Sequence, residues 1–308
     1  VSTVGTLLDG NLFTQCSFNI VMIDAAVGFT LQHNVFLRNT PVGLEWGSRP
    51  VPLGRPRLFG YGTTDLIIGF ADASTAVRNN DFIQRGEYTG GPDGCAIDLE
   101  TACHNLSIGP GNTFFHNVGA SVNVFGHAGL TSQNFTLTGN VIIQNGCQQG
   151  KPPYFAGAPG GGAPSSDVGA VSFDLAGGSG RISNNSIVRC ADETVPLWGG
   201  PPSHQENWSL DLNTVRSATD EMRTIVAQPT VLHDTRTKQW PNLIATTSTP
   251  GAVLHYTLDG SRPTEASPLW PPTPSTAGPY ALRTTPVLVR AFKTGMLPSA
   301  SEGVVRYV

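Results

Sequence analysis

The chain has few charged residues and almost no lysine. Asp, Glu, Lys and Arg make up 13% of its 308 residues, and its only lysines are Lys151, Lys238 and Lys293. The formal net charge of −4, without a cluster of basic residues, argues against a nucleic-acid partner. No apolar run approaches the roughly 18 residues of a membrane-spanning helix. The sequence therefore predicts neither a nucleic-acid partner nor a membrane span in this segment.

Helical periodicity and metal-binding motifs are also missing. None of the five cysteines belongs to a C-x-x-C motif, which argues against a zinc site. We expect no cofactor, with calcium as the alternative discussed below. The chain is instead rich in turn-forming residues, with 36 Gly and 24 Pro, and its apolar residues occur in short alternating runs. This composition predicts an all-β protein.

A short motif, Asn-x-Phe or Asn-x-Ile, recurs along the chain. It occurs at Asn11/Phe13, Asn34/Phe36, Asn80/Phe82, Asn112/Phe114, Asn140/Ile142 and Asn185/Ile187. Asn34 follows Asn11 by 23 residues, and Asn80 follows Asn34 by twice that number. Such a period, carried by β-rich runs, is typical of a stacked β-repeat. Asparagine suits the turn because it tolerates the left-handed backbone region.

This repeat resembles that of the right-handed parallel β-helix found in pectate-lyase-like proteins, many of which act on polysaccharides or lie on surfaces. The resemblance covers about residues 10–190 and implies about seven coils. Asn34, Asn80, Asn112, Asn140 and Asn185 would then occupy equivalent corners and form a ladder of side-chain amides.

We expect the β-helix to occupy residues 1–227. Segments rich in Gly and Pro, at 47–64 and 148–168, are predicted to be loop insertions. Residues 191–227 lose the repeat and are expected to form a cap or linker, with weak helical character over Thr214–Val226. The chain starts directly with Val1 and the first repeat, so we expect it to be a segment of a larger or processed protein.

A second domain is predicted at residues 228–308. Its clearest stretch, Tyr256–Thr264, reads Tyr-Thr-Leu-Asp-Gly-Ser-Arg-Pro-Thr, and Val289–Lys293 reads Val-Arg-Ala-Phe-Lys. Both resemble the C-terminal β-sandwich domain of chitobiase and β-hexosaminidases. The resemblance implies a small immunoglobulin-like antiparallel sandwich, an accessory to secreted carbohydrate proteins that carries no catalytic residue.

Two disulfides are possible. Cys95 and Cys103 lie eight residues apart around a turn, and Cys147 and Cys190 end equivalent coils. The alternative is that these cysteines are small buried residues within the solenoid.

Four Asn-x-Ser/Thr acceptors for N-glycosylation occur at Asn105, Asn134, Asn184 and Asn207, which is modest support for secretion.

The candidate site lies on the run that follows Cys95. Ile97 and Leu99 alternate with Asp98 and Glu100, so the two carboxylates share the outward face of one strand. In neighbouring coils, the equivalent polar residues are Asn123, His127, Ser172 and Asp174. This strip suggests a saccharide groove in which Asp98 and Glu100 are the catalytic pair of a glycoside hydrolase, and Asn123, His127 and Asp174 bind substrate.

Other interpretations of this strip stay open. A lyase is less favoured because few Lys or Arg residues lie near it to neutralise a uronate. Asp93, Asp98 and Glu100 could instead hold calcium. The simplest alternative is that outward polar residues face water.

Three classes of function follow. We favour an extracellular structural or glycan-binding module at the cell surface or in a secreted protein, with glycans and the other parts of a larger assembly as partners. The alternatives are a polysaccharide-active enzyme, with hydrolysis ahead of elimination, and a calcium-stabilised adhesin.

Overall fold

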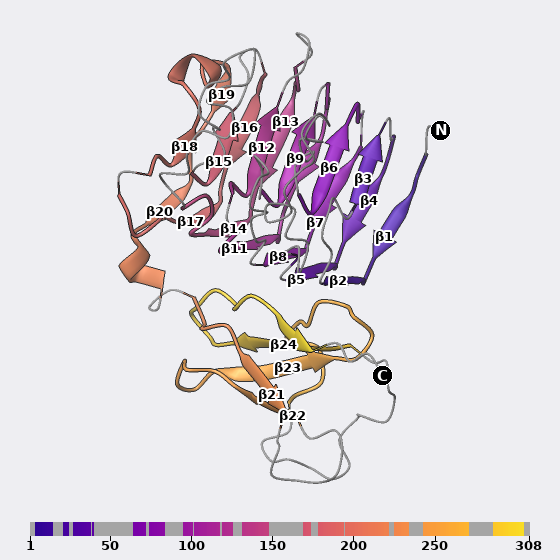
Figure 1. Ribbon diagram of the computed structural model, residues 1–308, viewed down its shortest axis with the longest axis vertical. Coiled ribbons are helices and arrows are strands. Elements are labelled where there is room, and N and C mark those ends of the chain that lie inside the picture. The colour runs from indigo at the N-terminus through magenta and orange to yellow at the C-terminus, as the bar shows by residue number, and fades with distance from the viewer. Residues whose placement is uncertain are drawn as a thin grey trace, which may run out of the picture.

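The computed structural model describes residues 4–14, 21–24, 27–37, 39, 64–71, 74–83, 95–100, 102–117, 119–125, 131–147, 169–173, 178–193, 195–221, 225–233, 243–270 and 286–304. The predicted fold class is confirmed. The chain forms a parallel β-helix with three sheets, followed by a small antiparallel β-sandwich (Figure 1). The loop insertions predicted at 47–64 and 148–168 lie outside these ranges, apart from Thr64.

Each coil of the β-helix contributes one short strand to each sheet in turn. Sheet 1 contains β1 (Leu7–Asp9), β4 (Thr30–Gln32), β7 (Ala76–Arg78), β10 (Ser107–Ile108), β13 (Phe135–Thr138), β16 (Gly180–Ser183) and β19 (Trp208–Ser209). Sheet 2 contains β2 (Leu12–Thr14), β5 (Val35–Leu37), β8 (Asp81–Ile83), β11 (Thr113–Phe115), β14 (Val141–Ile143), β17 (Ser186–Val188) and β20 (Thr214–Arg216). Sheet 3 contains β3 (Val21–Asp24), β6 (Leu66–Gly69), β9 (Ile97–Glu100), β12 (Val122–Phe125), β15 (Val171–Phe173) and β18 (Trp198–Gly199).

A two-residue corner joins each strand of sheet 1 to sheet 2 in most coils. The first corner residue has positive φ, as at His33 (56°), Asn79 (56°) and Gly139 (68°). The second is asparagine. Because the chain reverses direction within two residues, this corner needs one left-handed residue, and Asn or Gly adopts that conformation at little cost.

The corner asparagines form the predicted ladder. The backbone N–H and the Nδ2 of Asn80 both donate to Oδ1 of Asn112, at 2.9 and 3.1 Å. Asn112 donates in the same way to Asn140, at 3.2 and 2.9 Å. Equivalent pairs of bonds join Asn11 to Asn34, Asn34 to Asn80, Asn140 to Asn185 and Asn185 to Asn213. Each amide therefore satisfies backbone and side-chain groups that the core would otherwise leave without partners.

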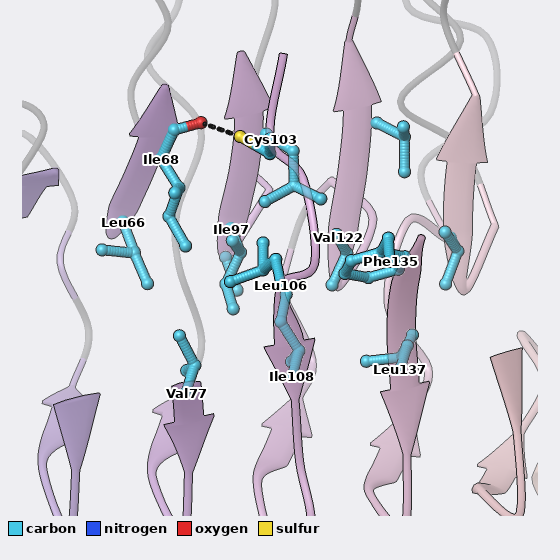
Figure 2. Packing of buried hydrophobic residues seen from close by; sticks show 14 of the residues in the cluster. Leu66, Ile68, Val77, Ile97, Cys103, Leu106, Ile108, Val122, Phe135 and Leu137 are labelled. Carbon is cyan, nitrogen blue, oxygen red and sulfur yellow. Dashed lines mark hydrogen bonds between the residues drawn. The ribbon is translucent and has the colours of Figure 1, made fainter. Parts of the chain in front are cut away.

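A column of aromatic rings runs beside this ladder. Phe13, Phe36, Phe82 and Phe114 stack with ring centroids 4.7, 4.8 and 5.1 Å apart. By strand register the column continues through Ile142, Ile187 and Val215. The inward residues of all three sheets pack against one another in the interior. Figure 2 shows this for Leu66, Ile97 and Val122 of sheet 3 and Leu137 of sheet 1. Stacked identical positions explain why the motif repeats in the sequence.

The repeat extends further than predicted. Residues 195–216, beyond the predicted limit at residue 190, form a further coil, in which β18, β19 and β20 continue the three sheets. The expected helical character of Thr214–Val226 is wrong at its start, because Thr214–Arg216 is a strand. Short 3-10 turns occur at η1 (Pro202–His204) and η2 (Ala218–Asp220), and Glu221 is helical, with its carbonyl oxygen accepting from the N–H of Ile225 at 2.9 Å. The sequence motif does not include this coil, because the apolar residue two positions after Asn213 is Val215 rather than Phe or Ile.

The C-terminal module consists of two small antiparallel sheets. β21 (Thr230–His233) pairs with β22 (Leu243–Thr246), and β24 (Val287–Phe292) pairs with both β23 (Val253–Thr257) and β25 (Glu302–Val304). Side chains of β22 and β24 form the core between the sheets. The module is the predicted antiparallel sandwich, and the domain boundary at residue 228 stays a prediction.

The module covers the outer face of sheet 2 (Figure 1). A second apolar cluster joins the two parts: Leu37, Ile83, Phe115, Ile143 and Val188 of sheet 2 pack with Ile225, Leu288, Leu297 and Ala300. Strands β5, β8 and β11 are consequently buried on both faces, as is usual for parallel strands covered on both sides.

Candidate functional site

A row of polar side chains crosses the outer face of sheet 3. Asp98 of β9, Asn123 of β12 and Ser172 of β15 are direct neighbours in the parallel register. Their sequence neighbours Ile97 and Val122 point inward to the core. Strand alternation therefore places the three polar groups on one line, with about 4.8 Å between adjacent strands. We call these three residues the sheet 3 polar row.

The polar row is hydrogen-bonded in one direction. The Ser172 hydroxyl donates to Oδ1 of Asn123 at 2.7 Å, and Nδ2 of Asn123 donates to Oδ1 of Asp98 at 3.3 Å. Because the amide carbonyl accepts from Ser172, its NH₂ group must face Asp98. Ser172 thus fixes the orientation of Asn123, and Asn123 supplies a donor to the carboxylate.

Burial separates the two carboxylates that the sequence had grouped together. Asp98 is only 5% exposed and Asn123 only 2%, whereas Glu100 is exposed. Asp98 and Glu100 alternate with the inward residues of β9, as the sequence predicted, but the alternative that the outward polar residues simply face water does not hold for Asp98. Alternation along a strand predicts toward which face of the sheet each side chain points, but it does not predict whether other parts of the chain cover that face.

The other predicted site residues lie outside the described part of the chain. This applies to Asp93, His127 and Asp174. Within the described ranges, no group of three His, Cys, Asp or Glu side chains gathers as a metal site. The calcium alternative drew on Asp93, so it stays a prediction.

A second buried carboxylate, Asp81, lies on the outer face of sheet 2. Its Oδ1 is 2.7 Å from Nε of Arg262 in the C-terminal module, and Ser301 donates to Oδ2 through its hydroxyl and its backbone N–H. Arg262 also donates to the carbonyl oxygen of Gly111 at 2.7 Å and to the Thr113 hydroxyl at 2.8 Å. We call Asp81, Thr113, Arg262, Arg290 and Ser301 the Asp81 cluster.

The electrostatic interactions within the Asp81 cluster keep the Asp81 carboxylate and the Arg290 guanidinium charged at neutral pH. Burial alone would raise the pKa of the Asp81 carboxyl, but the charges of Arg262 and Arg290 and the bond from Ser301 outweigh burial and hold the pKa below its ordinary value. Burial and the nearby charge of Arg262 lower the pKa of the Arg290 guanidinium to about 9, so it stays charged at neutral pH. The cluster therefore joins the two parts of the chain through a fully buried ion pair. Sequence reasoning missed it, although Arg262 lies within the stretch that resembled the chitobiase module.

One of the two predicted disulfides forms. Cys147 and Cys190 are bonded, across a sequence separation of 43 residues. The predicted bond between Cys95 and Cys103 is wrong: both are buried thiols. The Cys103 thiol donates to the carbonyl oxygen of Ile68 in the preceding coil at 3.1 Å (Figure 2), and burial raises its pKa to about 11. Its sulfur therefore belongs to the core, the alternative that the sequence had left open.

The four candidate glycosylation sites are exposed. Asn105, Asn134 and Asn184 have φ near 55° at corners of the β-helix, and Asn207 lies just before β19. Nδ2 of Asn134 donates to Oδ1 of Asn105 at 2.6 Å. Exposure at turns is what glycosylation requires, and modification of these residues stays a prediction.

Comparison with known proteins identifies the C-terminal module. Residues 236–302 match the family model of the chitobiase/β-hexosaminidase C-terminal domain. The match includes Arg262, Arg290 and Ser301. No curated protein and no solved structure matches the chain. In the residues that the structure describes, no helix is long and apolar enough to cross a membrane.

Proposed function

We propose that the chain is an extracellular structural or glycan-binding module, part of a larger secreted or cell-surface assembly. The observation that carries this proposal is the match of residues 236–302 to a domain named for two carbohydrate-active enzymes. The disulfide between Cys147 and Cys190 supports an oxidising compartment. The exposed glycosylation motifs at Asn184 and Asn207 agree with secretion.

The glycan surface that we propose is the outer face of sheet 3. Exposed Glu100 provides a charged acceptor for sugar hydroxyls, and the buried, hydrogen-bonded polar row beside it makes rigid the strand that carries Glu100. The outer face of sheet 2 is already occupied by the C-terminal module. Substrate contacts by His127 and Asp174 remain part of the proposal.

Affinity electrophoresis tests this proposal with a panel of soluble polysaccharides, and pull-down with insoluble chitin and cellulose extends the panel. We expect the chain to be retarded by at least one glycan. Glu100→Ala should weaken that binding about tenfold, the effect of losing one hydrogen bond to a charged group. Asp211→Ala is the matched control, because Asp211 is an exposed carboxylate beside sheet 1. Absence of retardation by every glycan would refute glycan binding.

Glycoside hydrolysis is the second candidate. Two carboxylates, two residues apart on one strand face, lie roughly 6–7 Å apart by strand rise, close to the spacing of about 6.5–9.5 Å in inverting enzymes. Asp98 would be the buried, hydrogen-bonded group and Glu100 the exposed one. Release of reducing ends by the unmodified chain, abolished in Asp98→Asn and in Glu100→Gln, would support catalysis. Activity that survives both substitutions would exclude these residues as catalysts.

A further inference from the structure

Phe70 is a large apolar residue in a backbone conformation that seldom suits one. It directly follows β6, its φ is 48°, and its side chain is 50% exposed. Among the described residues other than glycine, most with positive φ are polar, such as Asn79 and Asn134, and Leu212 is the other large apolar one. A bulky side chain at positive φ is strained, and an exposed ring recovers little of that energy from the core. This outlier therefore calls for a reason on the surface.

The surface beside Phe70 contains Glu100 and a second aromatic residue. In the parallel register, Gly69 of β6 is the partner of Glu100 of β9, and Glu100 is the partner of Phe125 of β12. The residue before each of these three belongs to the core, so strand alternation directs the three outward. Gly69 adds no side chain, Glu100 is exposed and Phe125 is partly exposed. We call Phe70, Glu100 and Phe125 the aromatic margin.

The charge around the aromatic margin has one sign. As the structure describes them, the strands of sheet 3 contain Asp24, Asp98 and Glu100 and no Lys, Arg or His. A carboxylate accepts hydrogen bonds from hydroxyl groups and repels other carboxylates. The margin therefore suits a neutral sugar and opposes a uronate.

The two phenylalanines suit the apolar face of a sugar ring. A pyranose whose hydroxyl groups are equatorial, such as a β-1,4-linked glucose or N-acetylglucosamine unit, exposes axial C–H groups on its faces, and these bury well against an aromatic ring. Strands β6 and β12 lie two strand spacings apart, about 10 Å, which two consecutive units of an extended chain span. The hydroxyl groups project from the ring edges, where Glu100 can accept from them.

We propose that the aromatic margin is the glycan subsite, with Phe70 and Phe125 stacking on successive sugar rings and Glu100 accepting from hydroxyl groups between them. Its ligand is a neutral β-linked glycan of gluco configuration and not a polyuronate. Figure 1 shows β6, β9 and β12 away from the C-terminal module, which packs on sheet 2. The inference rests on the proposed glycan binding and names its residues and its class of sugar.

Affinity electrophoresis of the 308-residue chain tests the class of sugar. The gels contain hydroxyethylcellulose or glycol chitin as neutral β-1,4-linked glycans, or polygalacturonate as the polyuronate. We expect retardation by a neutral glycan and none by polygalacturonate. Retardation by the neutral glycan should not change with added salt, because salt screens only the interactions between charges.

Substitution of Phe70 tests the stacking. Phe70→Asn should weaken retardation by the neutral glycan about tenfold, because it removes apolar surface that a sugar ring would bury. Asparagine adopts a φ of this kind at little cost, so the variant should keep its melting temperature. Phe70→Leu keeps apolar bulk and loses the flat ring, so it should also weaken retardation. Phe70→Trp enlarges the platform and should bind at least as tightly as the unmodified chain.

Leu212 provides a matched control for Phe70. It is 66% exposed, its φ is 55°, and it lies between β19 and β20, away from sheet 3. Leu212→Asn makes the same kind of change at the same kind of backbone position and should be retarded like the unmodified chain. Leu212 also shows that the chain accommodates leucine at positive φ, so Phe70→Leu provides a second folded variant.

Retardation by a neutral glycan that Phe70→Asn and Phe70→Leu both leave unchanged would overturn this inference and leave glycan binding intact. A preference for polygalacturonate would do the same. Equal losses in Leu212→Asn and Phe70→Asn would also overturn it, because exposed apolar surface in general would then carry the retardation. Absence of retardation by every glycan would refute both this inference and the proposed glycan binding.

Discussion

The outer faces of sheets 2 and 3 start from the same strand geometry and have different roles. Each has an outward aspartate near its centre, Asp81 on β8 and Asp98 on β9, and both are buried. Asp81 is paired with a buried arginine of another part of the chain, at 2.7 Å. Asp98 is hydrogen-bonded by the amide of its neighbour, Asn123.

This difference separates a structural carboxylate from a candidate functional one. The charge of Asp81 serves to hold the C-terminal module on sheet 2, because one carboxylate oxygen pairs with Arg262 and the other accepts from Ser301. The polar row at Asp98 lies beside exposed Glu100, on a face that the module does not cover. We therefore treat the module as an integral part of the fold and place the candidate chemistry on sheet 3.

The largest effect is expected when the charge of each aspartate is removed in turn. Asp81→Asn leaves the buried Arg262 without its counter-charge, and we expect it to lower the free energy of unfolding by about 3–5 kcal/mol. Asp98→Asn keeps an acceptor for Asn123 and should cost about 1 kcal/mol. Denaturant unfolding measures both values. Equal losses of unfolding free energy in the two variants would contradict the distinction between a structural Asp81 and a candidate functional Asp98.

The asparagine ladder allows a comparison between the middle and the end of the β-helix. Asn112→Ala removes the acceptor of two bonds from Asn80 and the donor to Asn140, and it leaves buried groups without partners. We expect a loss of about 3 kcal/mol. Asn11→Ala removes donors at a partly exposed end and should cost less than about 1 kcal/mol. If the end variant is as unstable as the central one, burial does not set the strength of the ladder.

Acid should weaken the contact on sheet 2 through Asp81. Its folded-state pKa is lower than its unfolded-state value of about 4, so the stabilisation is complete above that value and is lost as the pH falls through the folded-state pKa. The difference in melting temperature between the unmodified chain and Asp81→Asn should therefore be constant near neutral pH and shrink in strong acid. A difference that stays the same down to pH values of about 2 would show that the charge of Asp81 does not carry the effect.

The sequence predicted those parts of the fold that repeat. Every stacked coil needs an asparagine at the same corner and an apolar residue two positions later, so the spacing of Asn34, Asn80 and Asn112 was enough to reveal the solenoid. The coil at residues 195–216 was missed because Val215 ends the column in place of Phe or Ile. A β-branched aliphatic residue suffices there, since it lies in register with Ile187 and, among the described strands, is the last of the column.

The candidate site was predicted less completely, for a physical reason. Alternation in a strand shows that Asp81 and Asp98 both point outward, and it cannot show which face another domain will cover. The identity of the partner decides the role: Arg262 lies far from Asp81 in sequence and meets it only after the module docks. The partner of Cys103 could not be predicted from the sequence for the same reason. Its thiol donates to the carbonyl oxygen of Ile68 in another coil and is not bonded to Cys95, which lies nearby in the sequence.

Calorimetry of the intact chain tests most directly whether the C-terminal module is an integral part of the fold. A buried ion pair and a shared apolar cluster should make the β-helix and the module unfold together, so we predict one cooperative transition for the unmodified chain. Asp81→Asn should divide it into two, with the module melting first. Two separate transitions in the unmodified chain, at temperatures that Asp81→Asn leaves unchanged, would contradict the account.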